Sequence, residues 1–480
     1  MSSKAQTETT ATENTEASPS SLSESRELTY QQTLLASAAI GVAGGLIATL
    51  YYYVLEAFMH FVWYALPELI EHHFSRASLP HGIAHSGIYT IFLEPFFPSG
   101  IPSSIYIVIV ATIGGLLVGL ALRFLGPPGE ITSVVDNIHE PGKINPRQSP
   151  SMIVTSLLSI TAGGSLGPEA PLVQIIGSFG SWLANQLRLT IATVRLLTLC
   201  GMSAALGAFF GAPLGGAIFA LEIPHRRGLE FYEAIAPAVI SATLCFSLFR
   251  MSTGMSAAGI YHFPQIESIS VMNLFEGALL GVLGALVAAL FVLLFHTVGY
   301  LSKYLADYKI LLATLGGLSI GAIAFVFPQT LFFSEMEIQS IIVETGSNLG
   351  IKLLLMIALA KMLAIACTVH SGFRGGFIFP LFFVGASVGL AISLAVPQIH
   401  PTMGMLCMMA ALNVAITKTP VSTTVILTAA SGAAMVPVLV IASFVSFVLT
   451  SPLSVIKSQR SRTEQESSGV SCPKLLPVKA

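Results

Sequence analysis

The sequence predicts an all-α integral membrane protein in which many tilted and broken helices form two inverted repeats. Composition is the first observation behind this prediction. Of the 480 residues, 54% are apolar and only 10% are charged, and the mean hydropathy is +0.79. Soluble domains carry about 25% charged residues, so this composition is typical of a chain embedded in lipid. A net charge of −2 without a basic run gives no support to a nucleic-acid partner.

Two polar tails flank a long region that contains two kinds of apolar segment. Residues 1–29 are rich in Ser, Thr and Glu and are predicted to be a disordered polar tail. Charge-free stretches long enough to cross a bilayer, for which about 20 apolar residues suffice, lie at 33–55, 105–122, 277–295 and 310–327. Other apolar segments are shorter and are interrupted by Gly or Pro, which is typical of closely packed and discontinuous helices. Residues 457–480 form a second polar tail.

Basic residues in the polar segments predict the orientation in the membrane. Lys143 and Arg147 share one loop, Arg226 follows another apolar stretch, and Lys457 and Arg460 follow the last one. Because cytoplasmic loops are enriched in Lys and Arg, we expect a multi-pass protein with both termini in the cytoplasm. The five cysteines show no paired spacing, so neither a disulfide framework nor a metal site is expected.

Glu169 is the most informative residue in the chain. It lies in Gly-Pro-Glu-Ala-Pro, with uncharged, mostly apolar sequence on both sides. A carboxylate at membrane depth costs roughly 2.5–3.5 kcal/mol and is rarely kept there without a role. The preceding Gly-Pro predicts the start of a helix, where the positive end of the helix dipole favours an anion. Glu169 is therefore either a functional carboxylate or a simple helix cap.

A second observation is internal repetition. The Gly-x-x-x-Pro pattern of 167–171 recurs 209 residues later at 376–380, and Ala-Ala-Leu at 204–206 recurs at 410–412. The pattern predicts a first membrane repeat at 30–250, a linker at 251–269 and a second repeat at 270–456. Inverted repeats of transporters place the substrate at their interface, between broken helices. The two turns are then two walls of one site, and backbone N–H groups without a cationic side chain suit a small anion.

These motifs resemble those of the CLC family of chloride channels and chloride/proton antiporters. The resemblance rests on the segments 167–174, 371–380 and 210–222, and on Lys361, which precedes the segment 371–380. The resemblance spans about 30–456 and implies a homodimer with one pore per subunit. It implies that Glu169 is the gating glutamate and proton carrier. It also implies an anion site lined by the backbone of Pro127, Gly167, Ala170, Gly376, Phe377 and Ile378.

Three positions depart from the family pattern. Gly126 takes the place of a serine that touches the central anion, and Gly432, counted back from Pro437, takes the place of a tyrosine that closes the inner side of the site. With both side-chain donors missing, we expect a weaker or wider inner gate. Ile223 stands where antiporters usually keep an inner proton-transfer glutamate. Its neighbour Glu222 is either a shifted proton site or the cap of an inner helix.

Chloride transport, by a chloride/proton antiporter gated by Glu169, is the predicted function. An uncoupled, voltage-dependent chloride channel is the alternative, and another small anion such as fluoride or nitrate is possible in either mode. The resemblance implies chloride and protons as substrates, no cofactor and, because no large C-terminal regulatory domain follows, a prokaryotic inner (plasma) membrane. An enzyme is not expected, since neither His-Glu-x-x-His nor Gly-x-Ser-x-Gly occurs. Lys361 and Lys418 are interpreted as structural charges.

Overall fold

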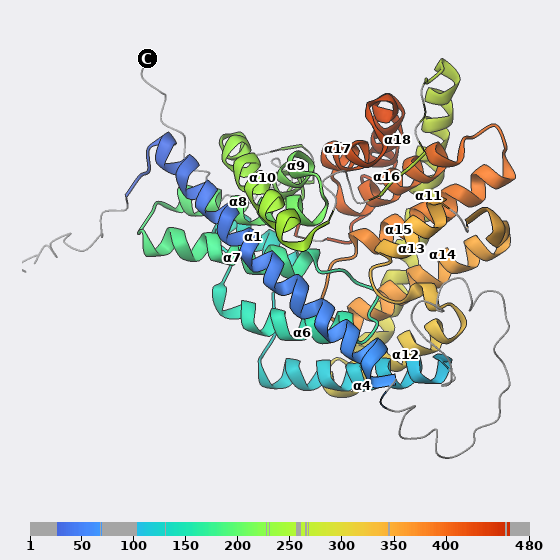
Figure 1. Ribbon diagram of the computed structural model, residues 1–480, viewed down its shortest axis with the longest axis horizontal. Helices are drawn as coiled ribbons and strands as arrows, with labels where there is room; N and C mark the ends of the chain where they lie inside the picture. The colour runs from blue at the N-terminus through green and yellow to red at the C-terminus, as the bar shows by residue number, and fades with distance from the viewer. Residues whose placement is uncertain are drawn as a thin grey trace, which may run out of the picture.

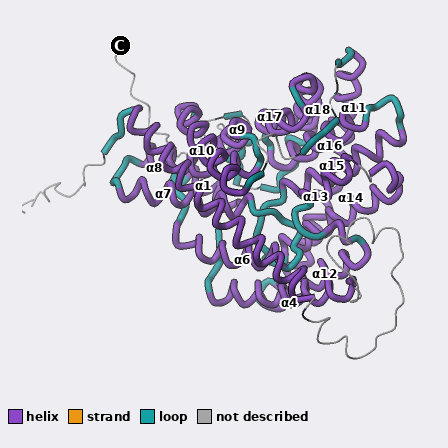
Figure 2. The backbone as a smooth tube through the Cα atoms, in the orientation of Figure 1, coloured by secondary structure: helices purple, strands orange, loops and turns teal. Residues whose placement is uncertain are grey.

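Helices make up nearly all of the regular structure in the part of the chain that the computed structural model describes (Figures 1 and 2). That part comprises residues 26–67, 69, 103–129, 131–226, 228–229, 231–255, 261–264, 266, 268–343, 346–456 and 458–460. Within it the only β-pairing consists of isolated bridges. The predicted all-α class is confirmed, whereas most of the predicted N-terminal tail lies outside the described residues.

The first half of the chain contains α1 (Tyr30–His60), α4 (Ser103–Phe124), α5 (Ile131–His139), α6 (Ser149–Thr161), α7 (Glu169–Gln186), α8 (Ile191–Phe209), α9 (Pro213–Glu222) and α10 (Ile235–Thr253). The second half contains α11 (Val271–Ser302), α12 (Lys309–Val326), α13 (Glu335–Val343), α14 (Gly346–His370), α15 (Ile378–Ala395), α16 (Pro401–Thr417), α17 (Pro420–Ser431) and α18 (Val436–Leu449). Eight helices of the described chain are long and apolar enough to cross a membrane, and they include the four predicted spans.

Local sequence explains where the helices begin. The Thr29 side chain accepts the backbone N–H of Gln32, whose side chain returns the bond, and Ser270 and Asn273 form the same capping box before α11. Proline opens α9, α16 and α17, at a position whose N–H has no partner within the helix. The first long helix of each half therefore starts with the same device.

The second half repeats the packing partners of the first. α1 packs on α10 as α11 packs on α18, α7 packs on α8 as α15 packs on α16, and α4 lies against α12. Glycines permit these close approaches, since a Cβ on Gly281 would lie 2.8 Å from the Ala442 carbonyl oxygen, and one on Gly41 would meet the Ser241 backbone. This correspondence favours two repeats, and the boundaries at 250 and 270 stay a prediction.

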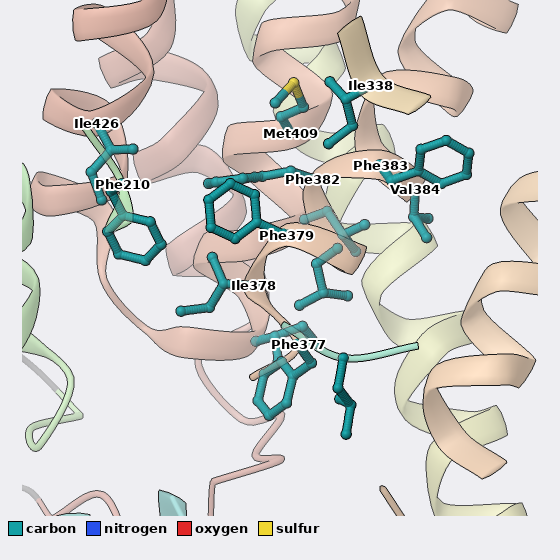
Figure 3. Close-up of a cluster of buried hydrophobic side chains, with 14 of the residues drawn as sticks. Phe210, Ile338, Phe377, Ile378, Phe379, Phe382, Phe383, Val384, Met409 and Ile426 are labelled. Atoms are coloured by element: carbon teal, nitrogen blue, oxygen red, sulfur yellow. The ribbon is translucent and has the colours of Figure 1, made fainter. Parts of the chain in front are cut away.

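α15 is the most enclosed of the long helices. Its phenylalanines Phe379, Phe382 and Phe383 are almost fully buried, and Figure 3 shows them among side chains from other elements, including Phe210 and Met409. Phe377 and Ile378 lie at the beginning of this helix, below the aromatic cluster in that view. The start of α15 is thereby fixed in the protein interior, away from water.

Candidate functional site: the junction of α7 and α15

The two broken-helix turns meet in space. The N–H of Gly167 donates to the Gly376 carbonyl at 2.7 Å, and the N–H of Gly376 donates to the Gly167 carbonyl at 2.7 Å. Residues 209 positions apart thus form an antiparallel bridge immediately before the helices that they introduce. The structure brings together the two motifs that the sequence singled out.

That bridge occupies two of the backbone amides in the predicted anion site. The amides of Gly167 and Gly376 are bonded to each other, so neither is available to an anion in this conformation. Pro127 has no N–H and cannot act as an amide donor at all. The remaining candidates are Ala170, in the first turn of α7, and Phe377 and Ile378 at the start of α15. Helix starts are the places where N–H groups lack partners within the helix.

Glu169 lies at the start of α15 as well as at that of α7. Its Oε1 accepts the N–H of Ile378 at 3.1 Å, and its side chain is 1% exposed. Oε2 has no hydrogen-bond partner among the described residues. The carboxylate therefore occupies the positive end of the α15 dipole, the position that a bound anion would take. It is held there through only one oxygen.

Two glycines create the space for this carboxylate. A Cβ on Gly376 would overlap the Glu169 carboxyl group, and a Cβ on Gly167 would overlap its Oε2. Neither glycine has a positive φ, so the requirement comes from close approach and not from backbone conformation. The glycines in both motifs therefore act by leaving room for a side chain.

A cavity with mainly apolar side chains extends from Glu169. Ala170, Phe377 and Ile378 line it near the carboxylate, and Ile223 and Thr417 also contribute to its wall. The other lining residues are Val134, Val135, Met152, Val173, Met202, Leu206, Phe219 and Gly376. A small anion in this space would depend on backbone N–H groups, since the described lining offers no cationic side chain.

The two altered filter positions lie elsewhere. Neither Gly126 nor Gly432 is among the described residues that line the cavity. Gly126 accepts a hydrogen bond from the Ser151 hydroxyl through its carbonyl, and Gly432 ends α17 with a φ of 89°. Their roles in anion selectivity stay a prediction. Ile223, in contrast, lines the cavity.

An aromatic loop covers the bridge between Gly167 and Gly376. A Cβ on Gly167 would lie 3.2 Å from the Cβ of Phe333, whose ring centroid is 6.1 Å from that of Phe209 and 6.3 Å from that of Phe379. Phe332 and Ser334, which flank Phe333, have positive φ values of 52° and 62°. Two left-handed residues with side chains in so short a loop are strained and need support from the surroundings.

Lys361 supplies that support. Its Nζ is fully buried and donates to the carbonyls of Thr330, Leu331 and Phe332 at 3.0, 3.1 and 2.8 Å, and to the Ser334 hydroxyl at 2.5 Å. The ammonium also lies 5.5 Å from the centroid of the Phe383 ring. Lys361 is therefore a structural residue, and its partners form the loop over the site. The signal in the sequence was a Lys with uncharged, mostly apolar residues on both sides in the middle of a helix.

Replacing Lys361 with Met is expected to lower the free energy of unfolding by about 2–5 kcal/mol. The change leaves buried carbonyls and a strained loop without their hydrogen-bond donor. This loss of stability is larger than the gain from no longer burying a charge. Thermal or chemical unfolding of the purified protein in detergent would measure it. Lys352→Met is the matched control, because Lys352 lies on the same helix and is exposed. Equal stability of the two variants would refute the assignment.

Glu222 is a second buried carboxylate, with a different environment. Its Oε1 accepts the N–H of Val421 at 3.1 Å, and its Oε2 accepts the N–H and hydroxyl of Ser422 at 2.9 and 2.6 Å. Both oxygens are satisfied at the first turn of α17, which fits the helix-cap interpretation. The capped helix lies about 200 positions further along the chain, so the neighbours His225 and Arg226 gave no hint of it.

Two residues close in sequence to Glu222 or to α17, His225 and Lys418, are also interpreted as structural. Lys418 Nζ donates to the Ala415 carbonyl at the end of α16 and to the Thr450 carbonyl after α18, both at 2.6 Å. Burial and the neighbouring His139 lower the pKa of His225, in the loop after α9, to about 3. The His225 imidazole is thus neutral at physiological pH.

The fold and the site together define a multi-pass membrane protein with a buried anion-like carboxylate between two broken helices. A family model described as voltage-gated chloride channel matches residues 114–451, which is more than half of the chain. The protein belongs to this family, the CLC family, and it is accordingly an anion transport protein and not an enzyme.

Comparisons with individual proteins agree. The chain is 26% identical over 373 residues to a chloride/fluoride channel protein of Pseudomonas syringae pv. tomato, a match that covers 74% of this chain and 78% of the relative. Its fold resembles a CLC-type fluoride/proton antiporter with a TM-score of 0.72 and 20% identity, covering 91% of this chain and all of the other. A slow cyanobacterial Cl⁻/H⁺ antiporter is similar with a TM-score of 0.70 and 20% identity, over 88% and 96% of the two chains.

Proposed function

We propose that the protein exchanges chloride for protons across the membrane and that Glu169 is both gate and proton carrier. The observation that carries this proposal is the Glu169 carboxylate at the N-terminus of α15, where Ile378 donates to one oxygen and the other has no partner among the described residues. We further propose that the chain works as a homodimer with both termini in the cytoplasm.

The mechanism follows from competition for one set of donors. Ionised Glu169 acts as a tethered anion and occupies the start of α15, so it excludes chloride from the Ile378 N–H. Protonation removes its charge and weakens that hydrogen bond, because charge-assisted bonds are roughly twice as strong as neutral ones. The neutral side chain leaves and chloride takes its place. Alternate occupancy by carboxylate and chloride couples the movement of the two ions.

The two buried carboxylates support the assignment by their difference. Glu222 accepts three hydrogen bonds, and removing it from α17 would break all of them. Glu169 accepts the N–H of Ile378 on Oε1, and its Oε2 has no partner among the described residues. A gate has to leave its position repeatedly, and of these two carboxylates Glu169 has fewer bonds to break.

Fluoride is a second candidate substrate, and uncoupled flow is a second candidate mode. The names of two similar proteins include fluoride, one as a channel and one as an antiporter. Uncoupled flow is favoured by Ile223, an apolar side chain at a position of the cavity wall where a proton carrier would otherwise be expected. Both candidates use the same amides at the start of α15 and differ in the ion or the coupling.

Coupled flux in liposomes tests the proposal. Purified protein is reconstituted with an outward chloride gradient and no pH gradient, and potassium with valinomycin holds the voltage at zero. We expect chloride efflux to drive protons inward, seen as acidification of the lumen. Chloride efflux without acidification would establish an uncoupled pathway.

Replacing chloride with fluoride in the same assay tests the second substrate. Liposomes without protein measure the passive leak of hydrogen fluoride, which carries protons outward with fluoride and makes the lumen more alkaline. Acidification of the lumen in the presence of protein, opposite in sign to this leak and with no chloride flux, would make fluoride the substrate.

A further inference from the structure

The cavity wall that includes Ile223 and Thr417 is tied to the C-terminal segment. Ile223 follows α9 and Thr417 ends α16, so the two residues come from different halves of the chain. The Gln459 side-chain amide donates to the carbonyls of both, with Nε2 at 2.9 Å from the Ile223 oxygen and 2.6 Å from the Thr417 oxygen. One NH₂ group, with both of its hydrogens used, thus joins two helix ends that line the cavity.

The residues around Gln459 are also held in place. The Arg460 carbonyl accepts the N–H of Arg226 at 3.0 Å, and the Arg460 guanidinium lies 3.3 Å from the Asp136 carboxylate on α5. Ile456 is 1% exposed and Gln459 is 4% exposed. The sequence predicts a polar tail from residue 457 onwards. The described residues 458–460 instead pack between helices, because Gln459 finds two buried carbonyls at the helix ends.

Three elements that line the cavity are therefore held together by residues 459 and 460, which we call the clasp. α5 contributes Val134 and Val135 to the cavity wall and holds Arg460, while the ends of α9 and α16 contribute Ile223 and Thr417 and hold Gln459. Glu169 lies at the start of α7, with Phe377 and Ile378, and the clasp joins residues at the ends of α9 and α16. One part of the cavity wall thus contains the Glu169 carboxylate, which can move away. Another part is held together by the neutral side-chain amide of Gln459.

We propose that Gln459 closes the cavity at Ile223 and Thr417 and limits which anions pass between them. The inference rests on the proposed function in one respect, that this cavity is the anion pathway. Separating the ends of α9 and α16 breaks two neutral hydrogen bonds, each of modest net strength. The two hydrogen bonds are weak enough to break by thermal motion. They still favour the closed form over the open form by about tenfold or more. An anion larger than chloride requires a wider separation and is disfavoured further.

The first test measures opening without measuring transport. Thr417→Cys places a thiol in the cavity wall, and its rate of modification by a cationic methanethiosulfonate reagent is followed in detergent. We expect Gln459→Leu, which removes the donor, to raise this rate about tenfold relative to the parent that keeps Gln459. Equal rates in the Gln459→Leu variant and in this parent would overturn the proposal.

Two controls accompany the modification experiment. Ser458→Ala is the matched substitution, since the Ser458 hydroxyl lies in the same segment and has no partner among the described residues. We expect it to leave the modification rate unchanged. Protein without Thr417→Cys gives the background from the native cysteines, which is subtracted from every rate.

The second test measures flux in liposomes, with full-length Gln459→Leu and Ser458→Ala. We expect Gln459→Leu to raise the thiocyanate-to-chloride flux ratio about tenfold and Ser458→Ala to leave it unchanged. An unchanged ratio in a variant with faster thiol modification would refute the role in selectivity. If no anion moves through any variant, the proposed function fails, and the modification rates still decide whether Gln459 is a closure. A monodisperse elution profile shows that each variant is folded.

Discussion

Replacing Glu169 with Gln is expected to abolish proton movement while anion flux persists. Glutamine has nearly the same shape but no charge and no titratable proton, so it neither holds the start of α15 as an anion nor carries a proton away. In the liposome assay, chloride-driven acidification should fall at least tenfold. Anion flux, which should rise as pH falls in the wild type because protonation releases the gate, should become independent of pH between about 4.5 and 7.5.

Glu222→Gln is the matched control for that experiment. Glu222 is 2% exposed, comparable with Glu169, but it caps α17 through both oxygens. We expect this variant to be less stable and to keep the coupling and the pH dependence of the wild type. If Glu169→Gln kept wild-type pH dependence, the gate would have to be another residue. If Glu222→Gln lost it, Glu222 would be more than a cap.

Gly376→Ala should release the gate without altering any titratable group. The added Cβ would overlap the Glu169 carboxyl group, and the Gly376 backbone cannot retreat because its N–H and carbonyl are both bonded to Gly167. The carboxylate must therefore leave the N–H of Ile378. We expect anion flux at neutral pH to rise several-fold and its pH dependence to flatten, as measured by efflux from liposomes at a series of pH values.

A double variant separates this effect from general damage. In a Glu169→Ala background the carboxyl group that the methyl group would overlap is gone, so adding Gly376→Ala should change flux by less than about twofold. Residues in contact are expected to show such non-additivity, whereas independent sites add. Additive effects of the two substitutions would mean that the methyl group acts through the backbone and not through Glu169.

The contrast between Glu169 and Glu222 shows how one arrangement serves two purposes. Each carboxylate lies at the N-terminus of a helix from the other half of the chain, α15 or α17, and each is almost fully buried. Glu222 has donors on both oxygens and is fixed. Glu169 has a donor on Oε1 but none among the described residues on Oε2, and Gly167 and Gly376 leave space around it. The unpartnered oxygen and the space around it support the proposal that Glu169 is a gate, whereas Glu222 is a cap.

The class, the long spans and the central motif of this protein follow from local sequence alone. A low fraction of charged residues, uninterrupted apolar stretches and a Gly-Pro-Glu run are local properties, and the cost of placing charge and unpaired backbone in lipid makes them decisive. The repeated Gly-x-x-x-Pro pattern also paired the turns before α7 and α15, which the bridge between Gly167 and Gly376 joins.

The distribution of polar groups among partners, in contrast, depends on how the helices pack. The amides of Gly167 and Gly376 bond to each other, Glu222 caps α17, Lys361 supports the loop at 330–334, and Gln459 ties Ile223 to Thr417. Each of these bonds joins residues that are about 30 to more than 200 positions apart, where neither periodicity nor spacing carries information. A buried donor or acceptor takes whichever partner the packed helices bring within reach, and that choice exists only once the fold has formed.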